Sequence, residues 1–131
     1  MAKFCFISRA QPGHLDFGGM SYIRTAVELK QRENEVQWIL SRNQRFDNDD
    51  LIVRTKKIAK DYGLNPREFI GLHTTASQKG NDLLKYAQNF SRYLKSRRYD
   101  CIVIDRLCVV AAFSAHLAGL PWATVGTDGR E

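Results

Sequence analysis

The sequence predicts an α/β fold, in which a three-layer, doubly wound and mostly parallel sheet of about five strands carries helices on both faces. Short apolar runs alternate with longer segments of helical periodicity along the whole chain. The run from Cys101 to Ile104 is continuously apolar between Asp100 and Asp105, which is typical of parallel strands covered on both faces. The length of 131 residues suits one domain, and no linker or internal repeat divides it. We therefore expect residues 1–131 to form a single Rossmann-like domain.

Each element follows from its own pattern. The strands are short apolar runs, and the helices have apolar residues three or four positions apart. In chain order, the sequence predicts a strand over Lys3–Ser8, a helix from Met20 into the charged run Lys30–Glu33, a strand over Glu35–Leu40, a helix between Asp50 and Gly63, a weak strand over Phe69–Leu72, a helix over Asn81–Ser96, a strand over Cys101–Ile104, a helix over Val109–Ala118 and a strand over Trp122–Val125.

The helices differ in how clearly they show an inner face. The second and third helical segments each present one apolar face. The predicted inner residues are Leu51, Ile52, Ile58 and Tyr62 in one helix, and Leu83, Leu84, Ala87, Phe90 and Leu94 in the other. The segment Val109–Ala118 is small and apolar all round, which predicts a buried helix ended by Gly119.

Composition excludes several classes of protein. The hydrophobic content of 44% and the charged content of 26% are those of a globular domain. Cys5, Cys101 and Cys108 have no metal-site spacing, and no EF-hand spacing occurs, so we expect buried or half-buried free thiols and no metal. The apolar run at the N-terminus is too short for a signal peptide, and no stretch is long enough to span a membrane. These features predict a cytoplasmic protein.

The formal net charge is +6, and the basic residues are concentrated in two clusters. They are Arg54, Lys56, Lys57 and Lys60 in one cluster, and Lys95, Arg97 and Arg98 in the other. Both clusters lie in predicted helices, where a solvated surface explains them, and an anionic membrane or an acidic ligand would fit as well. Because no nucleic-acid-binding module is recognisable, we expect no nucleic acid partner.

The candidate site lies beyond the carboxyl ends of the strands, where ligands bind in sheets of this kind. The loop after the first strand contains Gly13, His14, Gly18 and Gly19, but neither GxGxxG nor a P-loop. Asp105 directly follows the predicted fourth strand, which commonly neighbours the first. A carboxylate that accepts the Nδ1–H of His14 would leave the other nitrogen as a base for a substrate hydroxyl. Asp105 could equally serve as the cap of the next helix.

Three segments in register resemble the N-terminal half of GT-B glycosyltransferases of the UDP-glycosyltransferase superfamily. They are the opening strand Lys3–Ile7 followed by Pro12-Gly13-His14, the segment Ala26–Arg32 followed by Glu35-Val36, and Tyr99–Asp105 followed by Ala111-Ala112 and Ala118–Pro121. This sequence departs from the family at Glu33-Asn34, where glycine and histidine are usual, and it lacks the proline that usually follows the loop histidine. The resemblance covers nearly the whole chain.

The resemblance implies an inverting transfer of a sugar from a nucleotide sugar to the hydroxyl of a small-molecule or lipid acceptor, with no cofactor and no metal. His14 would be the base, Asp105 would orient it, the loop glycines would lie at the substrate, and Thr127 would lie near the donor sugar. The family's second domain, which holds most of the donor, has no counterpart in residues 1–131. The resemblance therefore predicts an incomplete enzyme that is inactive alone and needs the missing C-terminal domain in cis or in trans.

Two alternatives remain open from the sequence. The chain could be a stand-alone flavodoxin-like module that binds a nucleotide or a protein, although no phosphate or flavin motif supports this. It could also be one subunit of a split, membrane-associated glycosyltransferase whose basic helices meet anionic lipid. The face that a missing domain leaves uncovered further predicts peripheral membrane contact or homo-oligomers formed through that interdomain face.

Overall fold

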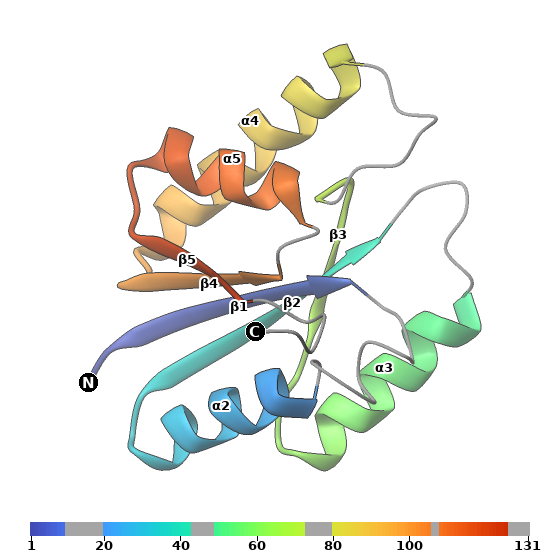
Figure 1. Cartoon of the computed structure of the whole chain (residues 1–131), viewed down its shortest axis with the longest axis vertical. Helices are drawn as coiled ribbons and strands as arrows, with labels where there is room; N and C mark the ends of the chain where they lie inside the picture. Colours follow the sequence, from blue (N-terminus) through green and yellow to red (C-terminus); the bar gives the residue numbers. More distant parts are fainter. Residues whose placement is uncertain (10–19, 43–48, 73–79, 106–107, 126–131) are drawn as a thin grey trace.

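The computed structural model describes residues 1–9, 20–42, 49–72, 80–105 and 108–125 (Figure 1). Strands and helices alternate along the chain, as the sequence predicted. They are β1 (Lys3–Arg9), α2 (Met20–Gln31), β2 (Glu35–Arg42), α3 (Asp49–Asp61), β3 (Arg67–Ile70), α4 (Gly80–Arg97), β4 (Cys101–Asp105), α5 (Val109–Ala118) and β5 (Trp122–Val125).

The five strands form one parallel sheet in the order β3-β2-β1-β4-β5. The chain builds outward from β1 to β3 and then returns to place β4 on the other side of β1. β1 and β4 are in register from Phe4–Cys101 to Ile7–Ile104. This pairing confirms the prediction that β1 and β4 are neighbours. The direction of winding reverses between these two strands.

Alternate residues of the central strands face two different helix layers, because side chains alternate across a strand. Cys5 and Ile7 of β1 pack in a cluster with Leu94 of α4 and Ala111 of α5. Phe6 faces the other way. Phe6 packs with residues of α2 and α3 and stacks on Trp38 of β2 at a centroid distance of 6.0 Å. Figure 1 shows α4 and α5 on one side of the sheet and α2 and α3 on the other. This is the predicted doubly wound, Rossmann-like arrangement.

Some predicted boundaries and faces are wrong. The third strand spans Arg67–Ile70 and not Phe69–Leu72, because Gly71 takes a φ of 80° and turns the chain out of the sheet. Tyr62 is exposed because it follows the last residue of α3, and the inner face of that helix includes Thr55 and Ala59 beside Ile52. Leu84 on α4 is also exposed, whereas Ala87, Phe90 and Leu94 are buried as predicted.

Helix α5 has the predicted bounds, and Gly119 ends it in the left-handed conformation with a φ of 69°. It is nevertheless not buried all round. Val110, Ala111, Ser114 and Ala115 face the core, whereas Val109, Phe113 and Leu117 are exposed. Apart from Ser114 and His116 the helix is apolar, so its sequence gave too little periodicity from which the exposed side could be predicted.

Candidate functional site

The carboxyl edge between β1 and β4 is the place where the fold itself favours a ligand. In open parallel sheets, ligands bind beyond the carboxyl ends of the strands where the winding direction reverses. Here that point lies between Arg9, the last residue of β1, and Asp105, the last residue of β4. Asp105 lies one position beyond the Ile7–Ile104 pair, level with Ser8. The structure thus places the predicted Asp105 at the expected edge.

Asp105 is fully buried and lies beside one basic side chain. Its carboxylate Oδ2 lies 3.8 Å from Nε of Arg9, an ion pair in which the guanidinium supplies a counter-charge inside the protein. Alternation along β4 puts the Asp105 side chain on the same face as Val103, which packs in the α2 and α3 layer. Helix α2 is the element into which the loop with His14 leads.

The structure does not support the alternative that the Asp105 side chain is the N-cap of α5. The N-cap of α5 is Cys108, whose side chain makes no capping hydrogen bond. The backbone carbonyl of Asp105 accepts a hydrogen bond from the Cys108 N–H at 2.8 Å, which closes a turn between β4 and α5. The carboxylate of Asp105 therefore does not have the N-cap position.

Cys108 follows this edge closely in the chain, but the environment of its thiol makes it inert. Burial raises the pKa of the Cys108 thiol well above its usual value of 9.0, and the charge of Asp105 raises it further, against a smaller opposite effect of Arg9. A protonated, fully buried thiol is a poor nucleophile. All three cysteines are free, and burial also raises the pKa values of Cys5 and Cys101, as expected for structural thiols.

The other predicted site residues are His14, Gly13, Gly18, Gly19 and Thr127, and they lie outside the described residues. The structure brings none of them into a described contact with Asp105. In the chain, residues 10–19 follow Arg9, which lies beside Asp105, and Thr127 follows β5, the other neighbour of β4. Within the described residues, no group of His, Cys, Asp and Glu could hold a metal ion.

Arg9 is the site residue that the sequence did not predict. It ends β1 and contacts a carboxylate 96 positions further along the chain, so only the sheet order connects the two residues. A basic residue at the end of one strand and an acidic residue at the end of another were visible in the sequence. Pairing the charged residues at the ends of neighbouring predicted strands would have predicted the contact between Arg9 and Asp105.

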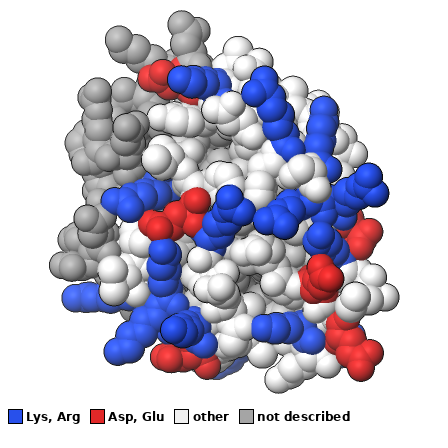
Figure 2. Space-filling model, turned by 180° about the vertical axis from the view of Figure 1, so that it is seen from behind, with Lys and Arg blue, Asp and Glu red and all other residues white. Residues whose placement is uncertain are grey.

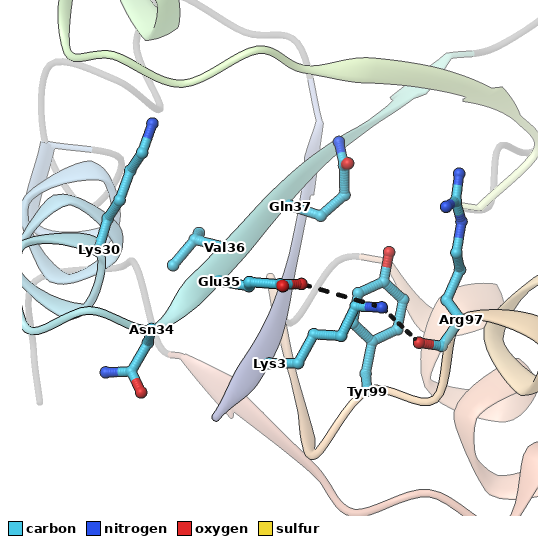
Figure 3. A pocket seen from close by; sticks show the side chains of 8 residues that line it. All are labelled: Lys3, Lys30, Asn34, Glu35, Val36, Gln37, Arg97 and Tyr99. Carbon is cyan, nitrogen blue, oxygen red and sulfur yellow. Dashed lines mark hydrogen bonds and ion pairs between the residues drawn. The ribbon is translucent and has the colours of Figure 1, made fainter. Parts of the chain in front are cut away.

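A hollow of about 380 Å³ lies at the opposite, amino edge of the sheet (Figure 3). Its lining residues are Lys3, Lys30, Asn34, Glu35, Val36, Gln37, Arg97 and Tyr99. Several of their polar groups hold the fold together. Lys3 Nζ donates to the carbonyl of Arg97 at 2.8 Å and lies 3.9 Å from the Glu35 carboxylate, and Asn34 Oδ1 accepts the Ala2 N–H at 2.9 Å. We therefore assign these groups a structural role, in which they connect the beginnings of neighbouring strands.

Basic side chains are spread over the side of the molecule that faces away from the viewer in Figure 1, and Figure 2 shows Lys and Arg outnumbering Asp and Glu there. On α3, the exposed Lys57 and Lys60 line a second hollow together with the exposed Val53 and with Lys56. Charged and apolar side chains are thus mixed on one helix. In the part of the chain that the structure describes, no helix combines the length and the apolar character needed to cross a membrane.

Comparisons with known proteins agree on the fold. No protein-family model matches the chain, and no curated protein is detectably similar to it in sequence. Among solved structures, a glycosyltransferase from Rickettsia africae has a TM-score of 0.62 at 12% identity, over 94% of this chain and 29% of its own. The spinosyn rhamnosyltransferase SpnG, complexed with thymidine diphosphate, has a TM-score of 0.61 at 14% identity, over 95% of this chain and 34% of its own.

A third structural neighbour has a different activity. The structure of a deacetylase–teicoplanin complex has a TM-score of 0.61 at 13% identity and covers 92% of this chain and 68% of its own. Identities this low show the fold alone. The chain therefore has the Rossmann-like fold found in GT-B glycosyltransferases, as predicted, and it spans about a third of the length of the glycosyltransferases that it matches.

Proposed function

We propose that residues 1–131 are the acceptor-binding N-terminal domain of a nucleotide-sugar-dependent glycosyltransferase. One observation carries this proposal. The fully buried carboxylate of Asp105 ends β4 at the point where the winding of the sheet reverses, beside the strand that leads into the loop of His14. The fold shared with glycosyltransferases over 92–95% of the chain supports it.

In this proposal His14 is the general base. It takes the proton from the acceptor hydroxyl, whose oxygen attacks the anomeric carbon of the donor sugar as the bond from that carbon to the nucleoside diphosphate breaks. Attack from the face opposite the leaving group inverts the configuration. Asp105 accepts the Nδ1–H of His14 and stabilises the imidazolium that forms, and Arg9 balances the carboxylate. Gly13, Gly18 and Gly19 leave room for the acceptor, and Thr127 lies near the donor sugar.

The donor nucleotide is bound by a second domain that residues 1–131 do not contain. The glycosyltransferases that match are about three times as long as this chain, and some of them, SpnG included, carry thymidine diphosphate. Residues 1–131 then supply the acceptor side only and have no transferase activity by themselves. The second domain joins them in the same polypeptide or as a separate subunit.

The proposed acceptor is a small molecule or a lipid. A lipid acceptor would bring the protein to an anionic membrane surface, and the lysines of α3, with Val53 exposed among them, suit such a contact. Cytoplasmic location fits the three free thiols. Peripheral contact of this kind needs no spanning helix.

The test is sugar transfer by the protein that carries residues 1–131 together with the donor-binding domain. His14→Ala is expected to lower kcat/KM by about 10²–10⁴-fold, because general base catalysis contributes about that much. Asp105→Asn is expected to lower it less, since the base itself remains. His116→Ala is the matched control, because His116 is an exposed histidine in the last turn of α5.

Circular dichroism and thermal unfolding separate loss of chemistry from loss of fold. In addition, an NMR titration of the His14 ring should move to lower pH in Asp105→Asn, because a nearby carboxylate favours the imidazolium. Wild-type transfer by the His14→Ala protein would refute the assignment of the base. Turnover by residues 1–131 alone would refute the two-domain arrangement.

A further inference from the structure

Asp105 differs from the other charged residues of the described structure in its burial. Among the residues whose burial the structure describes, it is the only carboxylate or basic side chain that is fully buried. Moving a single charge from water into a protein interior is costly, and a buried carboxyl group without a counter-charge takes up a proton instead. The ionisation of Asp105 therefore depends on the groups that lie against it.

Arg9 lies against this carboxylate. Its side chain is 19% exposed, and its Nε lies 3.8 Å from Oδ2 of Asp105. This separation is longer than an N–H···O hydrogen bond, which spans roughly 2.7–3.2 Å, so the contact acts through charge. The Nε atom of Arg9 is itself buried, and buried pairs are screened little by salt. Arg9 therefore supplies a positive charge to Asp105 inside the protein.

Backbone pairing fixes both ends of this contact. Arg9 is in register with Ser41 of β2, and Asp105 is in register with Val125 of β5. Each residue thus ends a central strand that an outer strand holds in place. Groups on paired strands keep their positions better than groups on loops. The place of Arg9 beside Asp105 is therefore built into the sheet.

The thiol of Cys108 indicates that both charges act in one buried region. Burial is the main cause that raises its pKa, the charge of Asp105 raises this pKa further, and the charge of Arg9 lowers it. Arg9 of β1 and Cys108 at the start of α5 are thus described ionisable groups that interact with Asp105. Of these two, only Arg9 carries a positive charge.

We propose that Arg9 is a positioning residue that keeps Asp105 ionised and acts on sugar transfer only through Asp105. The second half of this statement rests on the proposed function, in which the Asp105 carboxylate accepts the Nδ1–H of His14. A protonated Asp105 has no negative charge with which to stabilise the imidazolium. Loss of Arg9 should therefore affect transfer in the same way as loss of the Asp105 charge.

Infrared spectroscopy of the 131-residue chain tests the ionisation without any transfer reaction. At neutral pH, Arg9→Gln should show the carbonyl stretching band of a buried, protonated carboxyl group. The wild type should lack this band, and Arg9→Gln/Asp105→Asn should lose it again. Arg42→Gln is the matched control. It removes a positive charge from the end of the neighbouring strand β2, where Glu68 keeps its contact with Lys56, so no such band is expected.

Sugar transfer by the protein that includes the donor-binding domain tests the second half. At neutral pH, kcat/KM of Arg9→Gln should fall to within about twofold of that of Asp105→Asn, and the double variant should lose no more, because both changes remove the same charge. Raising the pH should restore transfer by Arg9→Gln as Asp105 loses its proton, and should not restore transfer by Asp105→Asn. A purely structural role of Arg9 would give no such recovery.

The two measurements also separate this role of Arg9 from the proposed function. Wild-type transfer by Asp105→Asn, with the band present in Arg9→Gln, refutes the catalytic part and leaves the ionisation by Arg9 intact. Absence of the band from Arg9→Gln, or an equal band in Arg42→Gln, overturns the proposal. If Arg9→Gln does not fold, Arg9→Gln/Asp105→Asn should fold, because it leaves no uncompensated charge. A double variant that also fails to fold overturns the proposal as well.

Discussion

The two edge strands of the sheet have the same length but opposite chemistry. β3 (Arg67–Ile70) begins with two charged residues, and both are held in place. Glu68 accepts hydrogen bonds from Arg42 at 3.2 Å and from Lys56 at 2.6 Å. Arg67 lies over the rings of Phe69 and Tyr93, at 5.3 and 5.1 Å from their centroids. β5 (Trp122–Val125) has no charged residue.

The two edge strands therefore differ in how far charged side chains hinder pairing with a further strand. At β3, a further strand would have to displace or bury the ion pairs of Glu68 and the cation–π contacts of Arg67. At β5, pairing buries apolar surface and leaves no charge unpaired. The β3 edge is thus protected by charged contacts that β5 lacks within the described residues.

The sharpest difference between the two edges concerns the glycines that border them. Gly71, which ends β3, has a φ of 80°, and an added Cβ would lie 2.6 Å from Cγ and 2.7 Å from Cε2 of Tyr86. Gly71→Ala is therefore expected to destabilise the fold by about 2–4 kcal/mol, because backbone strain and a displaced ring act together. Urea unfolding followed by circular dichroism measures this change.

Gly119, which separates α5 from β5, is the control for that measurement. Its φ of 69° is similar, but an added Cβ would meet no atom within 4 Å. Gly119→Ala should therefore cost only the strain of the left-handed conformation, about 1 kcal/mol. Equal losses for the two variants would mean that Tyr86 yields freely and that the β3 side is not tightly packed.

The sequence predicted most of the fold because the strands are buried on both faces and so appear as unbroken apolar runs. The bounds of α5 and β5 and the place of Asp105 at the carboxyl end of the fourth strand are confirmed, whereas the burial of Asp105 was not predicted. The features that were not predicted depend on how segments distant in the chain pack together. The exposed stripe on α5 could not be predicted, because a helix with apolar residues on every side has little periodicity. The contact between Arg9 and Asp105 exists only through the sheet order.

Vesicle binding extends the comparison to the helices. Lys57 and Lys60 lie on α3, next to β3 in the chain, whereas the region of β5 has no charge to attract anionic lipid. Each lysine near an anionic surface contributes about 1 kcal/mol, so the double variant Lys57→Gln/Lys60→Gln should bind phosphatidylserine vesicles about 10- to 30-fold more weakly. Sedimentation with vesicles at low salt measures this, and higher salt should reduce binding of the wild type.

The matched control for vesicle binding is Lys85→Gln/Lys95→Gln, which removes the same charge from α4, on the opposite face of the sheet (Figure 1). If α3 is the contact, this variant should retain most of the wild-type affinity. Equal losses for both double variants would show that net charge alone attracts the vesicles, with no dedicated surface on α3.

The smallest effect concerns the ion pairs of the β3 edge. The hydrogen bond from Lys56 is the main cause that lowers the pKa of Glu68 from its usual value of 4.5, and Arg42 adds to it against some desolvation. A lowered pKa in the folded state gives stability that is present above pH 4.5 and is lost as the pH falls through the folded value. Glu68→Gln should cost about 0.5–1 kcal/mol near neutral pH, and this difference should shrink below pH 4.5.

Glu28→Gln is the reference for Glu68→Gln, because Glu28 pairs with Arg32 on the solvent-exposed side of α2 at 2.8 Å. Exposed pairs four residues apart contribute about 0.3–0.5 kcal/mol, so its loss should be smaller and should depend more on salt. Urea midpoints of both variants across pH distinguish the two pairs. If Glu68→Gln costs no more than Glu28→Gln, the ion pairs of β3 protect the edge against association without stabilising the fold, since a charge that blocks a neighbouring strand need not contribute to folding.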